Sequence, residues 1–114
     1  MQYALLIYTE PGYLDSLSPA EQKAMSKEYW ALRDAPEVVT GAGLQPVTTA
    51  TTIRLAGGEM LVTDGPFADT KEVFGGIYLV EADNLDQATE IAARIPALRL
   101  GGAVEIRPTL GPAS

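Results

Sequence analysis

Two segments of this sequence are apolar at almost every position, and they constrain the fold more than any other feature. They are Ala4–Tyr8 (ALLIY), within the predicted strand Gln2–Thr9, and Ile77–Val80 (IYLV), within the predicted strand Phe74–Ala82. Both are short and rich in residues that favour strands. Because successive side chains of a strand point to opposite faces, both faces of each strand must leave water. One face can pack against helices of the same chain, and the other face needs a second cover.

Two helices are predicted between the strands. Ser18–Glu21 (SPAE) is a capping-box pattern with proline at the first helical position, so we expect a helix over residues 18–34. Asn84 resembles a second helix start, and an apolar stripe follows it as far as Ile95. Two helices cover one face of a sheet, and another copy of the chain is the simplest cover for the other face. We therefore expect a homodimer in which two sheets face each other.

The remaining segments complete an α+β pattern. Val47–Leu55 and Glu59–Thr63 are predicted to form a β-hairpin, and Ala103–Arg107 is predicted to be the last strand. The order is βα, a hairpin, then βαβ, which is typical of a ferredoxin-like split βαβ fold with an added β-hairpin. We expect a single domain over residues 1–110 and a C-terminal tail over 111–114.

Composition excludes several classes of function. The net charge of −7, with 15 acidic against 8 basic residues, argues against direct contact with nucleic acid or with an anionic membrane. The absence of cysteine and histidine excludes a thiolate nucleophile, an imidazole base and a Cys/His zinc site, so we expect no metal and no cofactor. No apolar stretch is long enough to span a bilayer, and the start Met-Gln-Tyr lacks the positively charged region of a signal peptide, so a cytoplasmic location is expected.

Alternation along the predicted strands selects four candidate ligand-binding residues. If the most apolar positions of each strand face the helices, the remaining positions share the helix-free face, where small residues leave room. A small polar cavity would result there. The alternative is that these side chains form ion pairs at an interface or in solvent. The four candidates are Arg54, Tyr78, Glu105 and Arg107.

The loop TDGPFADTKE (63–72) contains the candidate catalytic residues. Asp64 begins a rigid Asp-Gly-Pro corner, and its carboxylate is expected to accept hydrogen bonds from the loop amides. Phe67 is expected to seat the loop on the core. Lys71 and Glu72 place an amine beside a carboxylate, which suits an acid/base pair. The candidates are thus Asp64, Lys71 and Glu72; the alternative is a structural corner with solvated charges.

The stretch DGPFADTKEVFGGIYLVEA, with TTIR before it and AARIPALRLGGAVEIRP after it, resembles the DGPF proteins of the YCII-related family. The resemblance extends from Met1 to Pro108. It implies a dimeric α+β barrel, in which ferredoxin-like protomers pack sheet to sheet. It also implies a family whose DGPF members mostly lack an assigned activity and are often linked to extracytoplasmic-function sigma factors. Better-understood relatives are thought to use a His and Asp pair, and at least one is a dehalogenating lyase on a chlorinated hydroxyquinol.

Two functions follow from this resemblance and from the residues. The first is a small-molecule-binding protein with acid/base lyase or isomerase activity in the barrel cavity. In it Asp64 or Glu72 would act as the base and Lys71 as the acid, because the chain has no histidine. Arg54 and Arg107 would hold an anion or a carbonyl group. The alternative is a non-catalytic accessory or sensor module linked to such a sigma factor.

Overall fold

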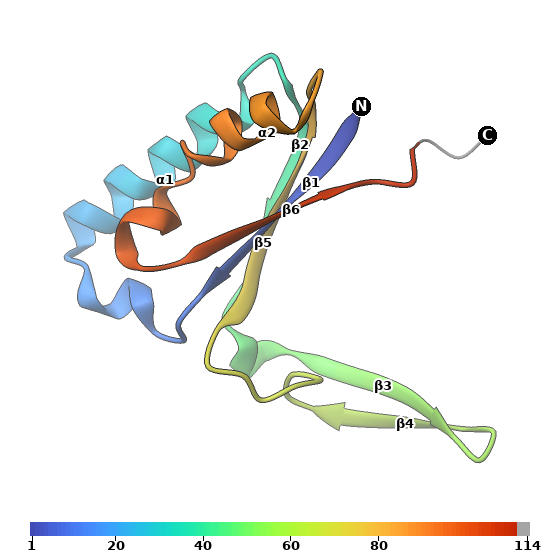
Figure 1. Ribbon diagram of the computed structural model, residues 1–114. Coiled ribbons are helices and arrows are strands. Elements are labelled where there is room, and N and C mark those ends of the chain that lie inside the picture. Colours follow the sequence, from blue (N-terminus) through green and yellow to red (C-terminus); the bar gives the residue numbers. More distant parts are fainter. Residues whose placement is uncertain (112–114) are drawn as a thin grey trace.

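The computed structural model describes residues 1–111, which form an α+β fold (Figure 1). The helices and strands are β1 (Gln2–Thr9), α1 (Pro19–Arg33), β2 (Val38–Gly43), β3 (Thr51–Ala56), β4 (Glu59–Asp64), β5 (Val73–Glu81), α2 (Leu85–Ala92) and β6 (Ala103–Pro108). Three short 3-10 turns join them: η1 (Tyr13–Ser16), η2 (Val47–Thr49) and η3 (Pro96–Leu100). Of the predicted tail 111–114, residues 112–114 lie outside the described residues.

Four strands form one antiparallel sheet in the order β2-β5-β1-β6, and both helices lie on one face of it (Figure 1). Each helix connects two strands that have a third strand between them, which is the split βαβ arrangement. The predicted α+β, ferredoxin-like fold is therefore confirmed. The apolar strand β1 lies between β5 and β6, so the most apolar strands are the central ones.

The added hairpin differs from the prediction. The edge strand of the sheet is β2, which the sequence did not reveal, whereas β3 and β4 pair with each other in a separate two-stranded sheet. The first hairpin strand begins at Thr51, because residues 47–49 form η2 instead. The hairpin is thus an insertion between β2 and β5 that projects away from the body of the molecule (Figure 1).

The core lies between the sheet and the helices. Leu5, Val80 and Ile95 have almost no exposed surface there, and each is supplied by a different element or connection. Their neighbours along β1 alternate: Tyr3 and Ile7 are also buried, while the residues between them are half-buried on the opposite face. We call that opposite side of the sheet the open face; its apolar residues are Ala4, Leu6, Tyr8, Ile77 and Leu79.

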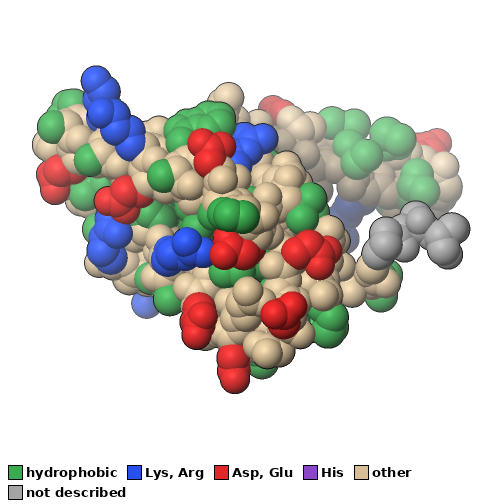
Figure 2. Space-filling model, turned by 90° about the horizontal axis from the view of Figure 1, so that it is seen from above, with side chains coloured by type: hydrophobic (Ala, Val, Ile, Leu, Met, Phe, Trp, Pro, Cys, Tyr) green, Lys and Arg blue, Asp and Glu red, His purple; other side chains and the backbone are tan. Residues whose placement is uncertain are grey.

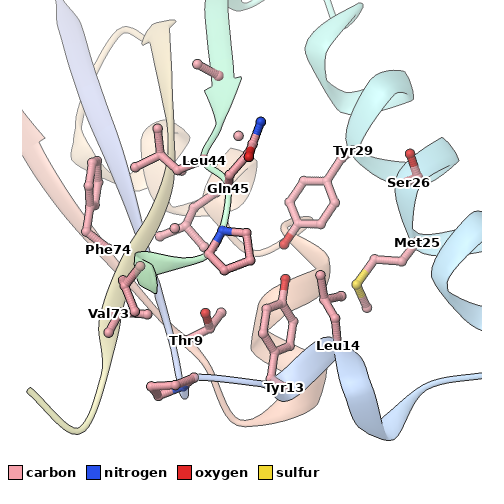
Figure 3. Close-up of a pocket in the computed structure, with 18 of the residues that line it drawn as sticks. Thr9, Tyr13, Leu14, Met25, Ser26, Tyr29, Leu44, Gln45, Val73 and Phe74 are labelled. Carbon is pink, nitrogen blue, oxygen red and sulfur yellow. The ribbon is translucent and has the colours of Figure 1, made fainter. Parts of the chain in front are cut away.

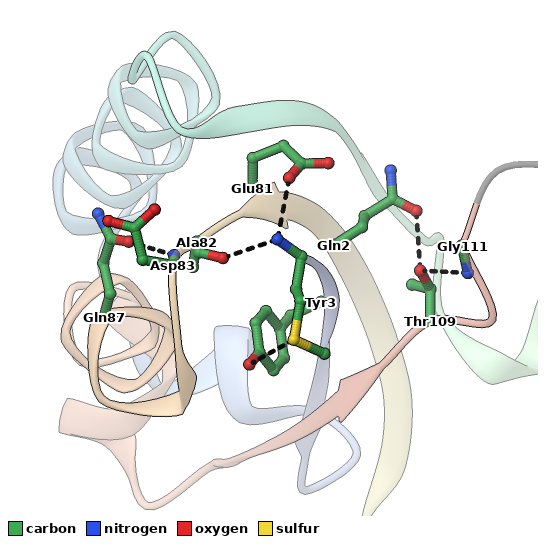
Figure 4. Close-up of polar contacts among 9 residues, drawn as sticks. Gln2, Tyr3, Glu81, Ala82, Asp83, Gln87, Thr109 and Gly111 are labelled. Carbon is green, nitrogen blue, oxygen red and sulfur yellow. Dashed lines mark hydrogen bonds and ion pairs between the residues drawn. The ribbon is translucent and has the colours of Figure 1, made fainter.

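Local signals fix the helix starts as predicted. Ser18 and Glu21 form the reciprocal capping box, with bonds of 3.0 and 3.1 Å, and Asn84 caps α2 by accepting a 2.9 Å bond from the Gln87 amide. Such bonds satisfy amides that have no partner within the helix. The first residue is also anchored, since the Met1 nitrogen donates to the Ala82 carbonyl over 3.0 Å (Figure 4).

The surface carries the acidic excess of the sequence. Acidic side chains are spread over the face seen in Figure 2, in keeping with the net charge of −7. Hydrophobic side chains are visible on the projecting hairpin in the same view. Within residues 1–111, no helix has the length and apolar character needed to cross a membrane.

Candidate functional site

An open pocket of about 770 Å³ lies on the helix side of the sheet, and we call it the helix-side pocket. Its volume lies within the range of small-molecule sites. It opens between α1, the turn η1 and the segment that follows β2 (Figure 3). Apolar walls alternate with hydroxyl and amide groups. The residues that define it best are Thr9, Tyr13, Leu14, Met25, Ser26, Tyr29, Leu44, Gln45, Val73 and Phe74.

Tight local structure holds η1 against α1 on one side of this pocket. Gly12 takes a left-handed conformation (φ 78°), which turns the chain sharply after β1. The side-chain amide of Gln22 in α1 then donates to the backbone carbonyls of Leu14 and Leu17 over 2.9 and 3.2 Å. These bonds tie the turn to the first part of the helix. The side chains of η1 are therefore presented to the pocket by a fixed segment.

Two tyrosines face each other across the pocket. The hydroxyls of Tyr13 and Tyr29 point toward one another (Figure 3). Burial, followed by the neighbouring Tyr13, raises the pKa of Tyr29 above its ordinary value. Loss of the hydroxyl proton would leave a negative charge in a poorly solvated site, which is unfavourable. Tyr29 therefore stays protonated at neutral pH and can act as a hydrogen-bond donor to a ligand oxygen.

A third tyrosine forms the floor. Tyr78 of β5 is buried, and its hydroxyl donates a 2.8 Å bond to the backbone carbonyl of Tyr29. Its ring lies close to Gly41 of the neighbouring strand: a Cβ atom at that glycine would come within 2.5 Å of a ring carbon. The missing side chain thus makes room for the aromatic ring. Burial raises the pKa of Tyr78, and the positive charge of Arg33 partly opposes that rise.

The rim of the pocket carries a cation and an exposed indole. The guanidinium carbon of Arg33 lies 5.2 Å from the centre of the Trp30 ring, within the range of a cation–π contact. Both side chains come from the last turns of α1 and line the pocket. Glu10 and Asp15 line it as well, so the rim offers groups of either charge.

A second pocket, of about 630 Å³, lies beside the loop that joins β4 to β5, and we call it the loop pocket. Pro66, Phe67 and Glu72 of that loop form one side of it. Its other side is formed by residues that also line the helix-side pocket. These shared residues, which we call the common wall, are Leu44, Gln45, Pro46, Val47, Val73 and Phe74.

Backbone groups and a threonine hold the Asp-Gly-Pro corner. The Gly65 amide donates to the Ala50 carbonyl over 2.8 Å, and the Thr52 hydroxyl donates to the Gly65 carbonyl over 2.7 Å. Gly65 has a φ of 106°, which a residue with a side chain rarely adopts. Among the hydrogen bonds of residues 1–111, none is made by the Asp64 side chain, so the predicted role of this carboxylate at the corner is wrong.

Phe67 also differs from its predicted role. Its side chain is 70% exposed, and the guanidinium carbon of Arg54 lies 4.3 Å from the centre of its ring. The loop is therefore not seated on the core by this residue. Instead, the cation–π contact joins the loop to one face of the hairpin.

The four predicted ligand-binding residues do not converge within one chain. Glu105 and Arg107 lie opposite Leu6 and Ala4 of β1, on the open face, as alternation predicts. Tyr78 lies on the helix side, so its predicted placement is wrong, although it lines the helix-side pocket. Arg54 belongs to the separate hairpin, because β3 pairs with β4 rather than with the main sheet. A shared cavity for all four is therefore not formed.

The predicted catalytic residues lie in or beside the exposed loop. Asp64 ends β4, while Lys71 and Glu72 precede β5, and all three are exposed. Glu72 lines the loop pocket, whereas Asp64 and Lys71 line neither pocket. Their catalytic roles stay predictions. Within the described part of the chain, no three carboxylate, histidine or cysteine side chains gather where they could bind a metal ion.

Sequence reasoning selected Tyr78 but missed the two facing tyrosines of the helix-side pocket, Tyr13 and Tyr29. Tyr13, Tyr29 and Leu44 come from segments far apart in the sequence, and no motif links them. One signal was present: Pro11-Gly12 indicated a turn at the end of the first strand, directly before Tyr13. Only the packing of α1 over the sheet shows where that residue points.

Comparisons with known proteins agree over nearly the whole chain. The family model described as the YCII-related domain matches residues 1–110. An uncharacterized protein, R00369 of Rhizobium meliloti (strain 1021), is 34% identical over 113 residues, which covers 95% of this chain and 91% of that protein. The match includes both pockets and the hairpin.

Proposed function

The chain belongs to the YCII-related family, and from that premise we propose that it binds a small molecule in the helix-side pocket. The observation that carries the proposal is the geometry of this pocket: about 770 Å³, with apolar walls and two facing tyrosine hydroxyls. Binding sites of this kind combine mostly apolar walls with a few placed polar groups. The raised pKa of Tyr29 supports the proposal, since perturbed groups cluster at functional sites.

The same geometry favours a ligand that carries a carbonyl or carboxylate oxygen. The protonated Tyr29 can donate to such an oxygen, and Arg33 at the rim can attract negative charge. In a lyase or isomerase, this donor would stabilise charge that develops on the oxygen. A base is also needed, and the carboxylates of Glu10 and Asp15 line the pocket. In the loop pocket, the carboxylate of Glu72 would act as the base.

The alternative proposal is a non-catalytic accessory or sensor module linked to an extracytoplasmic-function sigma factor. The exposure of Asp64, Lys71 and Glu72 favours it, because catalytic carboxylates and amines normally need partial burial to tune their pKa values. If the protein turns over a carbonyl compound and this turnover depends on Tyr29, the alternative is contradicted. Ligand binding without turnover would support it.

We propose that the protein is also a homodimer. Support comes from the open face, where half-buried apolar residues such as Leu6, Ile77 and Leu79 are covered by no helix. Packing two open faces against each other would remove this surface from water and form the barrel. Sedimentation at micromolar concentration is expected to give about twice the chain mass of 12.1 kDa.

The binding proposal can be tested through the single tryptophan of the chain. Trp30 lines the helix-side pocket, so its fluorescence reports on ligand entry. Aromatic carboxylates and ketones from a fragment library would be titrated against the protein, with saturation-transfer NMR as a second readout. Ser26→Tyr is expected to fill the pocket and abolish binding. Ala24→Tyr is the matched control, since Ala24 is exposed on the same helix but does not line the pocket.

Two outcomes would contradict the proposal. The first is that no fragment binds the wild-type protein at millimolar concentration. The second is that Ser26→Tyr and Ala24→Tyr bind fragments equally well, which would place the binding elsewhere.

A further inference from the structure

The two faces of the β3–β4 hairpin differ in what they contact. One face, which we call the arm face, carries the opposed pairs Ile53 with Val62 and Leu55 with Met60. These four side chains are between 60% and 76% exposed. The other face carries Arg54, whose guanidinium group packs on Phe67 of the same chain. The chain therefore engages one face of its hairpin and leaves the apolar one in water.

The arm face is exposed because the whole hairpin projects from the body of the molecule. The hairpin projects from the end of the sheet, on the side that the helices leave open (Figure 1). The radius of gyration is 16.0 Å, whereas a compact domain of this length has about 13 Å. An isolated two-stranded hairpin is marginally stable in water. A projecting hairpin with an apolar face is consequently expected to have a contact that the single chain does not provide.

The base of the hairpin is fixed rather than loose. The bonds from the Gly65 amide to Ala50 and from Thr52 to Gly65 tie its two strands to the corner at 2.8 and 2.7 Å. The two strands are thereby held together at the base before any partner binds. A fixed, preformed surface loses less entropy on association than a flexible one.

The areas fit a second copy of the same chain. The arm face exposes on the order of 400 Å², which is the size of the largest apolar patch on a typical monomer, and such patches are often functional. A stable interface needs roughly 800 Å² from each partner. The open face, with Leu6, Ile77 and Leu79, can supply the remainder. Around a two-fold axis, each copy can give an arm and receive one, so both apolar surfaces are covered together.

We infer that the β3–β4 hairpin is a dimerisation arm, whose arm face packs on a second copy of this chain. The inference rests on the proposed homodimer and adds the surface that makes it. The charges leave room for this contact: the four side chains of the arm face are uncharged, and the one acidic residue on the same side, Asp64, pairs with Thr51 at the base of the hairpin, where it can stay in water.

A pair of neighbouring substitutions tests the inference. Met60 lies on the arm face and the adjacent Leu61 lies on the opposite face, with exposures of 63% and 52%. Sedimentation equilibrium is expected to show that Met60→Glu weakens the dimer at least about 100-fold, because a carboxylate would enter an apolar contact. Leu61→Glu is expected to leave the dissociation constant within about threefold of wild type. Circular dichroism would show that both variants keep the fold.

Equal dissociation constants for the two variants would overturn the inference while leaving an open-face dimer intact. A monomeric wild-type protein would overturn it as well. Titration of fragments against Trp30 gives a separate readout, so loss of the arm contact is distinguishable from failure of the proposed ligand site.

Crosslinking gives an independent test. The chain has no cysteine, so Leu55→Cys can carry one benzophenone label on the arm face. In a mixture of ¹⁴N- and ¹⁵N-labelled protein, the label is expected to link light peptides to heavy ones. Crosslinks confined to peptides of one isotope would show that the arm contacts its own chain, and would overturn the inference.

Discussion

Gly41→Ala is expected to destabilise the protein through one side chain, Tyr78. A Cβ atom at position 41 would lie 2.5 and 2.7 Å from two carbons of the Tyr78 ring, where ordinary contacts begin near 3.4 Å. The ring is 5% exposed and its hydroxyl is bonded to the Tyr29 carbonyl, so it can move only by losing contacts. The substitution therefore strains the floor of the helix-side pocket.

The magnitude follows from two effects. Inserting a methyl group into a packed site costs about 1–3 kcal/mol. Losing the Tyr78 hydrogen bond adds about 1 kcal/mol. The free energy of unfolding is therefore expected to fall by about 2–4 kcal/mol, measured by urea denaturation followed by circular dichroism.

The neighbouring glycine of the same strand is the matched control. A Cβ atom at Gly43 would meet no atom within 4 Å, so Gly43→Ala is expected to be neutral or to stabilise by up to about 1 kcal/mol. A double-mutant cycle isolates the cause. In a Tyr78→Ala background, most of the cost of Gly41→Ala should vanish. An unchanged cost in that background, or equal costs for the two glycines, would refute the reasoning.

Three further outcomes are expected from the structure. Thr52→Val should lower the free energy of unfolding by about 1 kcal/mol in urea denaturation, because it removes the hydrogen bond to the Gly65 carbonyl. Asp64→Ala should change that free energy by less than about 0.5 kcal/mol. A larger loss for Asp64→Ala than for Thr52→Val would contradict the hydrogen bonding of the Asp-Gly-Pro corner. Because the folded-state pKa of Tyr29 is raised above 10.0, the unfolded chain loses that proton first, so stability should be complete below pH 10 and decline as the pH rises further. Tyr29→Phe should make that decline shallower above pH 10, and an unaltered slope would exclude Tyr29 as its source. Gly102→Ala should lower the free energy of unfolding by more than about 3 kcal/mol in the same assay, since its Cβ would lie 2.8 and 2.9 Å from the carbonyl oxygens of Tyr8 and Ala97. A near-neutral result would contradict the packing of η3 on β1.

The parts of the fold that depend on local chemistry could be predicted from the sequence. The caps at Ser18 and Asn84 and the doubly apolar strand at residues 2–9 each signal their own structure within a few residues. Strand β2 could not be predicted in this way. Its sequence, VVTGAG, contains two glycines in six residues and is mostly exposed, so neither propensity nor alternation marks it.

The candidate site was less predictable, because its residues are brought together only by tertiary packing. Both faces of β5 are apolar, so alternation alone could not decide whether Tyr78 or Leu79 faces the helices. The space at Gly41 and the Tyr29 carbonyl decide it in favour of Tyr78. Likewise, Arg54 has the right alternation for a sheet face but belongs to a different sheet from Glu105 and Arg107.

The common wall gives the two pockets a thermodynamic link. Leu44–Val47 has the helix-side pocket on one side and the loop pocket on the other, so a molecule that shifts this segment from one side alters the volume available on the other. Coupling between two binding events is reciprocal: whatever one occupant does to the affinity of the second, the second does to the first by the same factor. An occupant of the helix-side pocket can thereby change the affinity of the loop pocket, which is lined by Pro66 and Phe67 of the Asp-Gly-Pro-Phe loop.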